Sequence, residues 1–338
     1  MHLSKQSYLN IAVIALFMSH TAFTFAADEV AESTKPVTEQ LVNTLTKLAG
    51  GPHAGYRSNH AKGIVVQGEF TPAASAASIT KAVHLQGQPS NVVVRFSDAT
   101  GVPNIPDANG NAFPKGMAIR FQLPDDGFTD IVVISVNGFP AATPEDFLGL
   151  LNAVAASGPD APKPSPVETF LNTHPAAAKF VSTPKPAPVS FATQAFYGVN
   201  AFKFTNAKGE THYGRYIIEP VKGQAFLTKE EQEKAAPNYL MDELPQRLAK
   251  EATSYRIALQ VASTGDEVND ATVSWPSDRK VIELGTLTLR GMHPQGEAFA
   301  KANMYNPLVL VEGIEPSNDP ILLARPGAYA VSYGRRLK

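Results

Sequence analysis

The chain has 338 residues, and its 29 basic and 31 acidic side chains give a formal net charge of −2 at neutral pH. This balance, without a run of Lys or Arg, argues against nucleic-acid binding as the main task. The absence of cysteine excludes disulfides, a thiol nucleophile and thiolate metal sites.

The first 26 residues are typical of a secretory signal peptide. Lys5 precedes an apolar stretch from Ile11 to Met18, and Thr24-Phe25-Ala26 fits a small-x-small cleavage site. The apolar stretch is too short for a transmembrane helix, and no other segment looks membrane-spanning. We therefore expect an exported, periplasmic protein without a membrane anchor. The remaining 338 − 26 = 312 residues are expected to form one domain, residues 27–338.

The first half of the mature chain mixes helices with strands. Apolar residues at helical spacing, with Pro36 at the start and Gly50-Gly51 at the end, predict an amphipathic helix within 34–51. Apolar, β-branched runs between Gly-, Pro- and Asn-rich segments predict strands at 63–70, 91–97, 117–123 and 130–136. A second helix is expected at 143–158, because Thr143 is a good N-cap residue and Pro144 suits the first helical position.

The second half begins with a Pro/Ala-rich stretch at 158–189, which fits either a long structured loop or short helical turns. A helical region begins at Thr228, and the strands predicted around it lie at 201–204, 212–218, 255–261 and 281–289. Strands on both sides of helical insertions, without an internal repeat, favour one domain over two. The predicted class is α+β, with an antiparallel β-barrel core and helical insertions.

A run near the C-terminus, GIEPSNDPILLARPGAY at 313–329, places Arg325 four residues before Tyr329. Arg-x-x-x-Tyr alone is common, and its ordinary interpretation is a surface arginine near a packed tyrosine. The complete run resembles the segment of the catalase family that carries the haem-ligating tyrosine. The matching residues are Gly313, Ile314, Glu315, Pro316, Ser317, Asp319, Arg325 and Tyr329. The resemblance implies that Tyr329 ligates the iron, as tyrosine does in catalase.

A tyrosine binds iron as phenolate, which is scarce at neutral pH because the ordinary pKa of tyrosine is about 10. A guanidinium held against the phenol oxygen favours the anion, since opposite charges attract. The resemblance implies that Arg325 plays this part for Tyr329. It also makes Asp319 the expected hydrogen-bond acceptor for Arg325.

A second segment, Arg57-Ser58-Asn59-His60-Ala61-Lys62-Gly63, resembles the part of catalases that faces the other side of the haem. A histidine at a strand entrance is usually a structural or surface residue. Peroxide cleavage, however, needs a group that moves a proton from one oxygen to the other, and imidazole suits this task. The resemblance assigns this role to His60, and the orienting hydrogen bond to Ser97. Asn59 is a departure, because the family usually has a small apolar residue there.

Haem carries two propionates, and arginine offers planar paired donors for carboxylates. Arg57, Arg95 and Arg336 fall where catalases place their propionate-binding arginines, and one alignment gap would exchange Arg336 for Arg335. The resemblance continues through 170–175 and 197–213, so that it covers most of 52–338. The implied cofactor is haem b.

Departures from the family pattern indicate the subfamily. The family's distal asparagine aligns best with Gly138, and Asn137 takes that position only if the alignment slips by one residue. Ala142-Thr143 replaces an expected Phe-Phe pair, which predicts a wider and less hydrophobic access route. Catalases usually continue well beyond the tyrosine, whereas this chain ends at Lys338. The chain thus looks like the short, exported catalase-related peroxidases.

We therefore predict a haem-dependent peroxidase that reduces hydrogen peroxide or organic hydroperoxides with a small organic electron donor, and that has weak or no catalase activity. The predicted catalytic residues are His60, Ser97 and Asn137. The protein is expected to be a monomer or homodimer without a nucleic-acid or membrane partner. Two alternatives stay open: a fatty-acid hydroperoxide isomerase resembling allene oxide synthase, and a non-enzymatic periplasmic haem carrier.

Overall fold

The runs predicted as strands form a closed antiparallel sheet in a computed structural model, which describes residues 34–338. The predicted signal peptide, residues 1–26, lies outside the described residues. Within them the strands are β1 (Gly63–Pro72), β2 (Ser90–Ser97), β3 (Gly116–Gln122), β4 (Phe128–Ile134), β5 (Phe196–Tyr197), β6 (Phe202–Thr205), β7 (Thr211–Pro220), β8 (Thr253–Val261), β9 (Val281–Met292) and β10 (Ile314–Pro316).

The sheet closes into a barrel because β7 pairs with both β5 and β8. Around the ring the order is β7, β8, β9, β1, β2, β3, β4 and β5, and every neighbouring pair is antiparallel. Strands β6 and β10 continue from β7 outside this ring. The antiparallel barrel expected from the strand pattern is thus confirmed.

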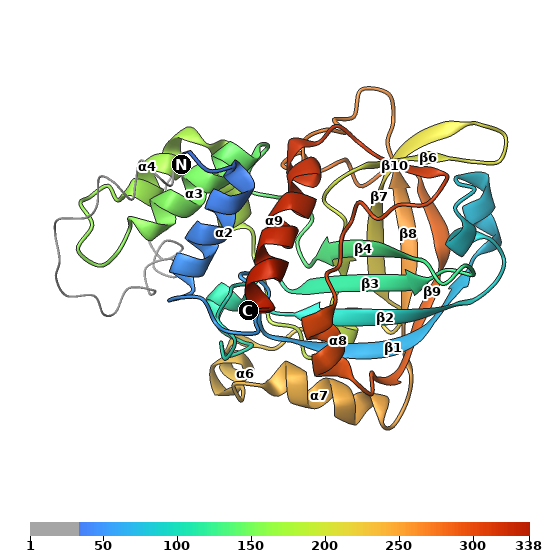
Figure 1. Cartoon of the computed structure of the whole chain (residues 1–338), viewed down its shortest axis with the longest axis horizontal. Helices are drawn as coiled ribbons and strands as arrows, with labels where there is room; N and C mark the ends of the chain where they lie inside the picture. The colour runs from blue at the N-terminus through green and yellow to red at the C-terminus, as the bar shows by residue number, and fades with distance from the viewer. Residues whose placement is uncertain (1–33) are drawn as a thin grey trace.

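The helices of residues 34–338 are α2 (Val37–Leu48), α3 (Pro144–Ala155), α4 (Pro166–Thr173), α5 (Pro175–Ser182), α6 (Lys229–Lys234), α7 (Tyr239–Leu248), α8 (Gly296–Ala302) and α9 (Pro320–Arg336). The Pro/Ala-rich stretch therefore forms the short helices α4 and α5. Figure 1 shows α2, α3 and α4 grouped at one end of the barrel, with α9 between this group and the strands. In the described part of the chain, no helix has the length and apolarity needed to cross a membrane.

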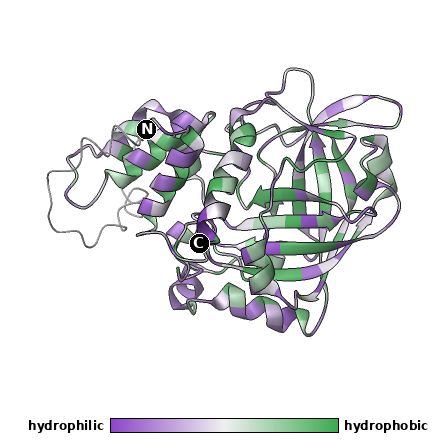
Figure 2. Ribbon diagram, viewed as in Figure 1, coloured by the Kyte–Doolittle hydropathy of each residue, from purple (hydrophilic) through white to green (hydrophobic). Residues whose placement is uncertain are grey.

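The barrel encloses the main hydrophobic core. Phe96 is fully buried, and its ring stacks on that of Phe191 with centroids 5.0 Å apart. Phe70 and Phe121 meet edge to face at 5.2 Å, and the ring of Tyr255 is buried beside Phe96. Figure 2 shows apolar residues along the barrel strands, while the solvent-exposed helix α6 is largely hydrophilic.

Helix α9 was not predicted, although it carries the run that contains Arg325 and Tyr329. Pro326 lies inside it, and Gly327 adds a second weak helix former. The helix nevertheless begins at a favourable N-cap residue, Asp319, whose carboxylate accepts a hydrogen bond from the backbone N–H of Ile321 at 2.9 Å. Packing against α2 and α3 then outweighs the weak local propensity.

Candidate active site

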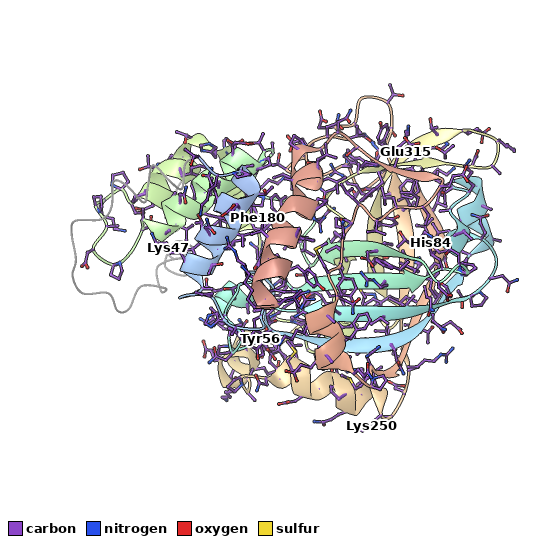
Figure 3. All side chains as sticks on the ribbon, viewed as in Figure 1. Lys47, Tyr56, His84, Phe180, Lys250 and Glu315 are labelled. Atoms are coloured by element: carbon purple, nitrogen blue, oxygen red, sulfur yellow. The ribbon has the colours of Figure 1, made fainter. Side chains whose placement is uncertain are left out.

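A cavity of about 270 Å³ lies between the barrel and the helices α2, α3 and α9. Strands β2, β3 and β4 form its barrel wall, and the loop before β1 reaches it from another side. This loop lies against α9, because the Ser58 N–H donates to Ser332 Oγ at 3.1 Å. Tyr56, labelled in Figure 3, belongs to the same loop.

The cavity brings together all but one of the site residues predicted from the sequence. Asn137 is the exception. The lining residues that were predicted are Arg57, His60, Arg95, Ser97, Arg325, Tyr329 and Arg336.

Arg325 and Tyr329 are joined directly on α9. The phenol oxygen of Tyr329 accepts from Arg325 Nε at 3.0 Å and from Nη2 at 2.9 Å. Both hydrogen bonds come from one charged guanidinium, which makes them stronger than bonds between neutral groups. The spacing works because residues i and i+4 lie on the same face of a helix.

The structure corrects the expected partner of Arg325. Arg325 Nη1 donates to Asn200 Oδ1 at 2.8 Å, and Asn200 Nδ2 donates to Asp319 Oδ2 at 2.8 Å. Asp319 therefore acts on Arg325 only through Asn200, and its other oxygen caps α9. Asn200 is 2% exposed, so a missing partner there would leave a buried polar group unsatisfied. Sequence reasoning missed Asn200, which lies 125 residues before Arg325.

On the opposite side of the site, the predicted hydrogen bond between His60 and Ser97 is present. Ser97 Oγ and His60 Nδ1 are 3.1 Å apart. Gly116 makes room for this pair, since a Cβ there would lie 2.7 Å from Ser97 Oγ and 2.8 Å from His60 Nδ1. Sequence reasoning missed Gly116, because it shows only as the first residue of a strand.

Two buried ion pairs support the loops around His60. Lys62 Nζ lies 2.5 Å from Asp107 Oδ1, and Lys115 Nζ lies 2.5 Å from Asp98 Oδ1. Lys115 also donates to the carbonyl of Asp107 at 2.6 Å, so the two pairs form one network. Burial raises the pKa of Asp98 to about 7, and the charge of Lys115 opposes this rise. The network ties Asp98, the residue after Ser97, to Lys115 and Asp107, and through Asp107 to Lys62 near His60.

His60 stands in a strongly positive environment. Burial, followed by the charges of Arg95 and Arg57, lowers the pKa of His60 to about 3. The imidazole is therefore neutral at physiological pH, which is the form that accepts a proton.

Arg57, Arg95 and Arg336 form a cationic cluster without a carboxylate partner among the described residues. Their hydrogen bonds go to backbone carbonyls instead; Arg57 and Arg336 both donate to the carbonyl of Asn303, at 3.0 and 2.7 Å. Burial, and then the charges of Arg95 and Arg336, lower the pKa of Arg57. Arg95 Nε is buried without a hydrogen-bond partner within residues 34–338. Such a cluster suits a bound anion, and two carboxylates would balance it.

The structure decides between the two C-terminal arginines. Arg336 is 3% exposed and lines the cavity. Arg335 instead donates to Asn43 Oδ1 at 2.5 Å, on helix α2. Arg336 is thus the member of the cluster, as the ungapped alignment predicted.

Asn137, the predicted distal amide, lies outside the cavity. The side chain of Asn137 is exposed and does not line the cavity, and its carbonyl accepts from Ser274 Oγ at 2.9 Å. Gly138 has φ = +157° and also lies outside the lining. The segment 137–138 therefore supplies no side-chain amide to the cavity, although the next residue, Phe139, lines it.

The wider, less hydrophobic access route expected from Ala142-Thr143 stays a prediction, because neither residue lines the cavity. Thr143 caps α3 through the N–H of Asp146 and, like Ala142, is not among the lining residues. The rings of Phe139 and Phe147 lie 4.9 Å apart and both line the cavity. Apolar residues of α2 complete this wall, namely Leu41, Val42 and Leu45.

Comparison with known proteins identifies the family. The family model for catalase matches residues 53–337. A catalase-related peroxidase from Synechococcus elongatus is 36% identical over 85% of this chain and 85% of its own length. One from Mycolicibacterium paratuberculosis is 32% identical over 84% of this chain and 90% of its own length. The chain belongs to the catalase family, whose members depend on haem.

Solved catalases share the fold. A fungal catalase superimposes with a TM-score of 0.73 at 22% identity, covering 84% of this chain and 60% of its own. Catalase A from Saccharomyces cerevisiae gives a TM-score of 0.73 at 22% identity, covering 88% and 64%. The chain therefore spans less than two thirds of the length of these catalases, and the likeness concerns the barrel and its helices.

We expect Gly116→Ala to slow the reaction of the haem-loaded protein with hydrogen peroxide about tenfold or more, because the added Cβ displaces His60 and Ser97. Haem content should stay unchanged, since Tyr329 lies on a different element. Rapid mixing measures the rate. Gly110→Ala is the matched control, because a Cβ there meets nothing within 4 Å. Equal rates for the two variants would contradict the prediction.

The low pKa of His60 predicts a flat pH profile. With a pKa of about 3 the imidazole stays an available base as the pH falls, whereas a histidine of ordinary pKa, about 6.5, loses this role in mildly acidic solution. The rate of reaction with peroxide should therefore be constant from about pH 8 to about pH 5. A fall in rate centred near pH 6.5 in a rapid-mixing series would show that His60 titrates normally.

Proposed function

We propose that this protein is a haem-dependent peroxidase, which binds haem b and reduces hydrogen peroxide or organic hydroperoxides with a small organic electron donor. One observation carries the proposal. A single cavity holds the Arg325–Tyr329 pair, the His60–Ser97 pair and a cluster of arginines that lack carboxylate partners among residues 34–338.

The residues present fit haem. Tyr329 offers the phenolate oxygen for the iron, and the buried donors of Arg57, Arg95 and Arg336 suit the two propionates. Asn200 keeps Arg325 on the phenol oxygen, so the negative charge of the ligand is held in place. Bound haem supplies the redox-active iron; the protein supplies orientation and electrostatics.

His60 moves the proton in this scheme. Its neutral imidazole would take a proton from one oxygen of the peroxide and deliver it to the other, which leaves as water or alcohol when the O–O bond breaks. The remaining oxygen is released as water after the organic donor has supplied two electrons and two protons have been taken up. Ser97 holds the ring by its hydrogen bond to Nδ1, so that Nε2 is the atom available for the transfer. The apolar side chains of Phe139 and Phe147 limit the water around these steps.

The pairing of His60 with Ser97 separates this function from a haem carrier. A carrier needs the iron ligand and the propionate arginines, but a positioned base gives it no advantage. The names of the two catalase-related peroxidases support the same assignment. We further propose that the protein acts in the periplasm, because residues 1–26 have the pattern of a signal peptide.

The assignment of Tyr329 has a direct test. Tyr329→Phe removes the phenol oxygen that Arg325 holds, so we expect haem to be lost or to change its ligation. The absorption spectrum and the haem content of the purified variant measure this. Tyr333→Phe is the matched control one turn further along α9, where the hydroxyl donates to the Ala302 carbonyl at 2.8 Å. An unchanged ferric spectrum with full haem content in Tyr329→Phe would refute the assignment.

Peroxidase turnover should exceed peroxide dismutation. Dismutation requires a second peroxide to be held in a reactive pose, and positioning lowers the entropic part of that barrier. Asn137 lies outside the cavity and contributes no fixed amide for this purpose. Oxygen evolution and oxidation of a phenolic donor, compared at one peroxide concentration, measure the balance. Vigorous oxygen release with little donor oxidation would identify a catalase instead.

A further inference from the structure

Asn59 joins the two loops that meet at the active site. Its side-chain oxygen Oδ1 accepts the backbone N–H of His60 at 3.0 Å and that of Thr100 at 2.7 Å. The Ala61 N–H also donates to the Thr100 carbonyl at 3.0 Å. One carbonyl oxygen with two lone pairs thus serves both loops.

Both residues that donate to Asn59 have an unusual backbone. His60 has φ = 55° and Thr100 has φ = 75°, in the left-handed region. That region is unfavourable for residues with a Cβ, and most of all for a β-branched residue such as Thr100. Such strain persists only where surrounding contacts hold it. The Asn59 oxygen supplies a contact at the N–H of each strained residue.

The same contact affects the imidazole. Three hydrogen bonds hold His60. Asn59 accepts from its backbone N–H, Arg95 Nη2 donates to its carbonyl at 3.0 Å, and Ser97 Oγ pairs with its ring nitrogen Nδ1. Rotation of the backbone at His60 would swing the side chain away from Ser97. Asn59 is therefore placed to set the direction in which the ring leaves the backbone.

We propose that Asn59 is a positioning residue, whose side-chain oxygen holds the His60 and Thr100 backbones and thereby keeps the His60 imidazole in its reactive orientation. The inference rests on the proposed function of His60 as the proton-transferring group. It assigns a task to a residue that stands out in the sequence only as a polar substitution beside the histidine.

The test uses two variants of similar size in the haem-loaded protein. Asn59→Leu removes the acceptor oxygen, whereas Asn59→Asp keeps an oxygen for both N–H groups. Two rates are measured by rapid mixing: reaction with hydrogen peroxide, and binding of hydrogen cyanide, which gives up a proton on binding without turnover. Asn109→Leu is the matched control, since the Asn109 side chain likewise accepts a backbone N–H, from Asn111 at 2.9 Å, in an exposed turn.

We expect Asn59→Leu to slow both reactions about 10-fold to 100-fold with haem content unchanged, because a misplaced catalytic group loses effective concentration. Both rates of Asn59→Asp should stay within about threefold of those of the parent protein, and the rates of Asn109→Leu should equal those of the parent. Parent-like rates in Asn59→Leu would overturn the proposal. Equal losses in Asn59→Leu and Asn59→Asp would overturn it as well, since the oxygen would then not be what matters.

A double variant shows whether Asn59 acts through His60. Adding Asn59→Leu to His60→Ala should change neither rate by more than about twofold, because effects transmitted through one group do not add. A further loss as large as in the parent background would refute the proposal. If His60→Ala itself reacts at the parental rate, the proposed role of His60 fails. If His60→Ala is slow and Asn59→Leu is not, only the inference about Asn59 fails.

Hydrogen exchange in the unaltered protein gives a test that does not depend on how Asn59→Leu folds. The proposal requires the amides of His60 and Thr100 to be protected, since both N–H groups are held by Asn59. Exchange of either amide as fast as in an exposed loop would overturn it.

Discussion

The contact between Arg325 and Tyr329 depends on one constraint, which is the helical register of α9. Two residues four positions apart share a face only on an intact helix. A shift of one residue would turn Tyr329 by about 100° about the helix axis and away from the cavity. Both oxygens of the Asp319 carboxylate support this register. One oxygen caps the helix, and the other accepts a hydrogen bond from Asn200. Asn200 in turn anchors Arg325.

The electrostatics of the cavity serve two purposes at once. Arg57, Arg95 and Arg336 give one end of the site a positive field that suits carboxylates. Burial first, and then the charges of Arg95 and Arg57, disfavour a protonated His60, so the imidazole stays neutral. The same buried arginines thus suit an anion and add to the effect of burial on the pKa of His60. Burial strengthens both effects, because the field is poorly screened away from water.

Local patterns predicted the barrel strands well but missed α9. The strands β1 to β4 follow short apolar, β-branched runs between Gly-, Pro- and Asn-rich segments, and this combination favours strands over helices. Helix α9 contains Pro326 and Gly327, whose propensities argue against a helix. Its stability comes from the apolar face that packs against other elements, which a local window does not contain. A local window also could not show which residues near Ala142-Thr143 reach the cavity. In the structure, Phe139 and Phe147 line it and form an apolar wall.

The sequence by itself determined the family, through contiguous motifs of distinctive residues, and the barrel class, through its strand-like runs. The pairing of His60 with Ser97 was an implication of the family resemblance, and the hydrogen bond is present in the structure. Only the tertiary structure decided that Asn200, rather than Asp319, contacts Arg325, and that Asn137 lies outside the site. Motifs specify which residues are present. The direction of a side chain and its partner more than a hundred residues away depend on the path of the whole backbone, which local spacing does not encode.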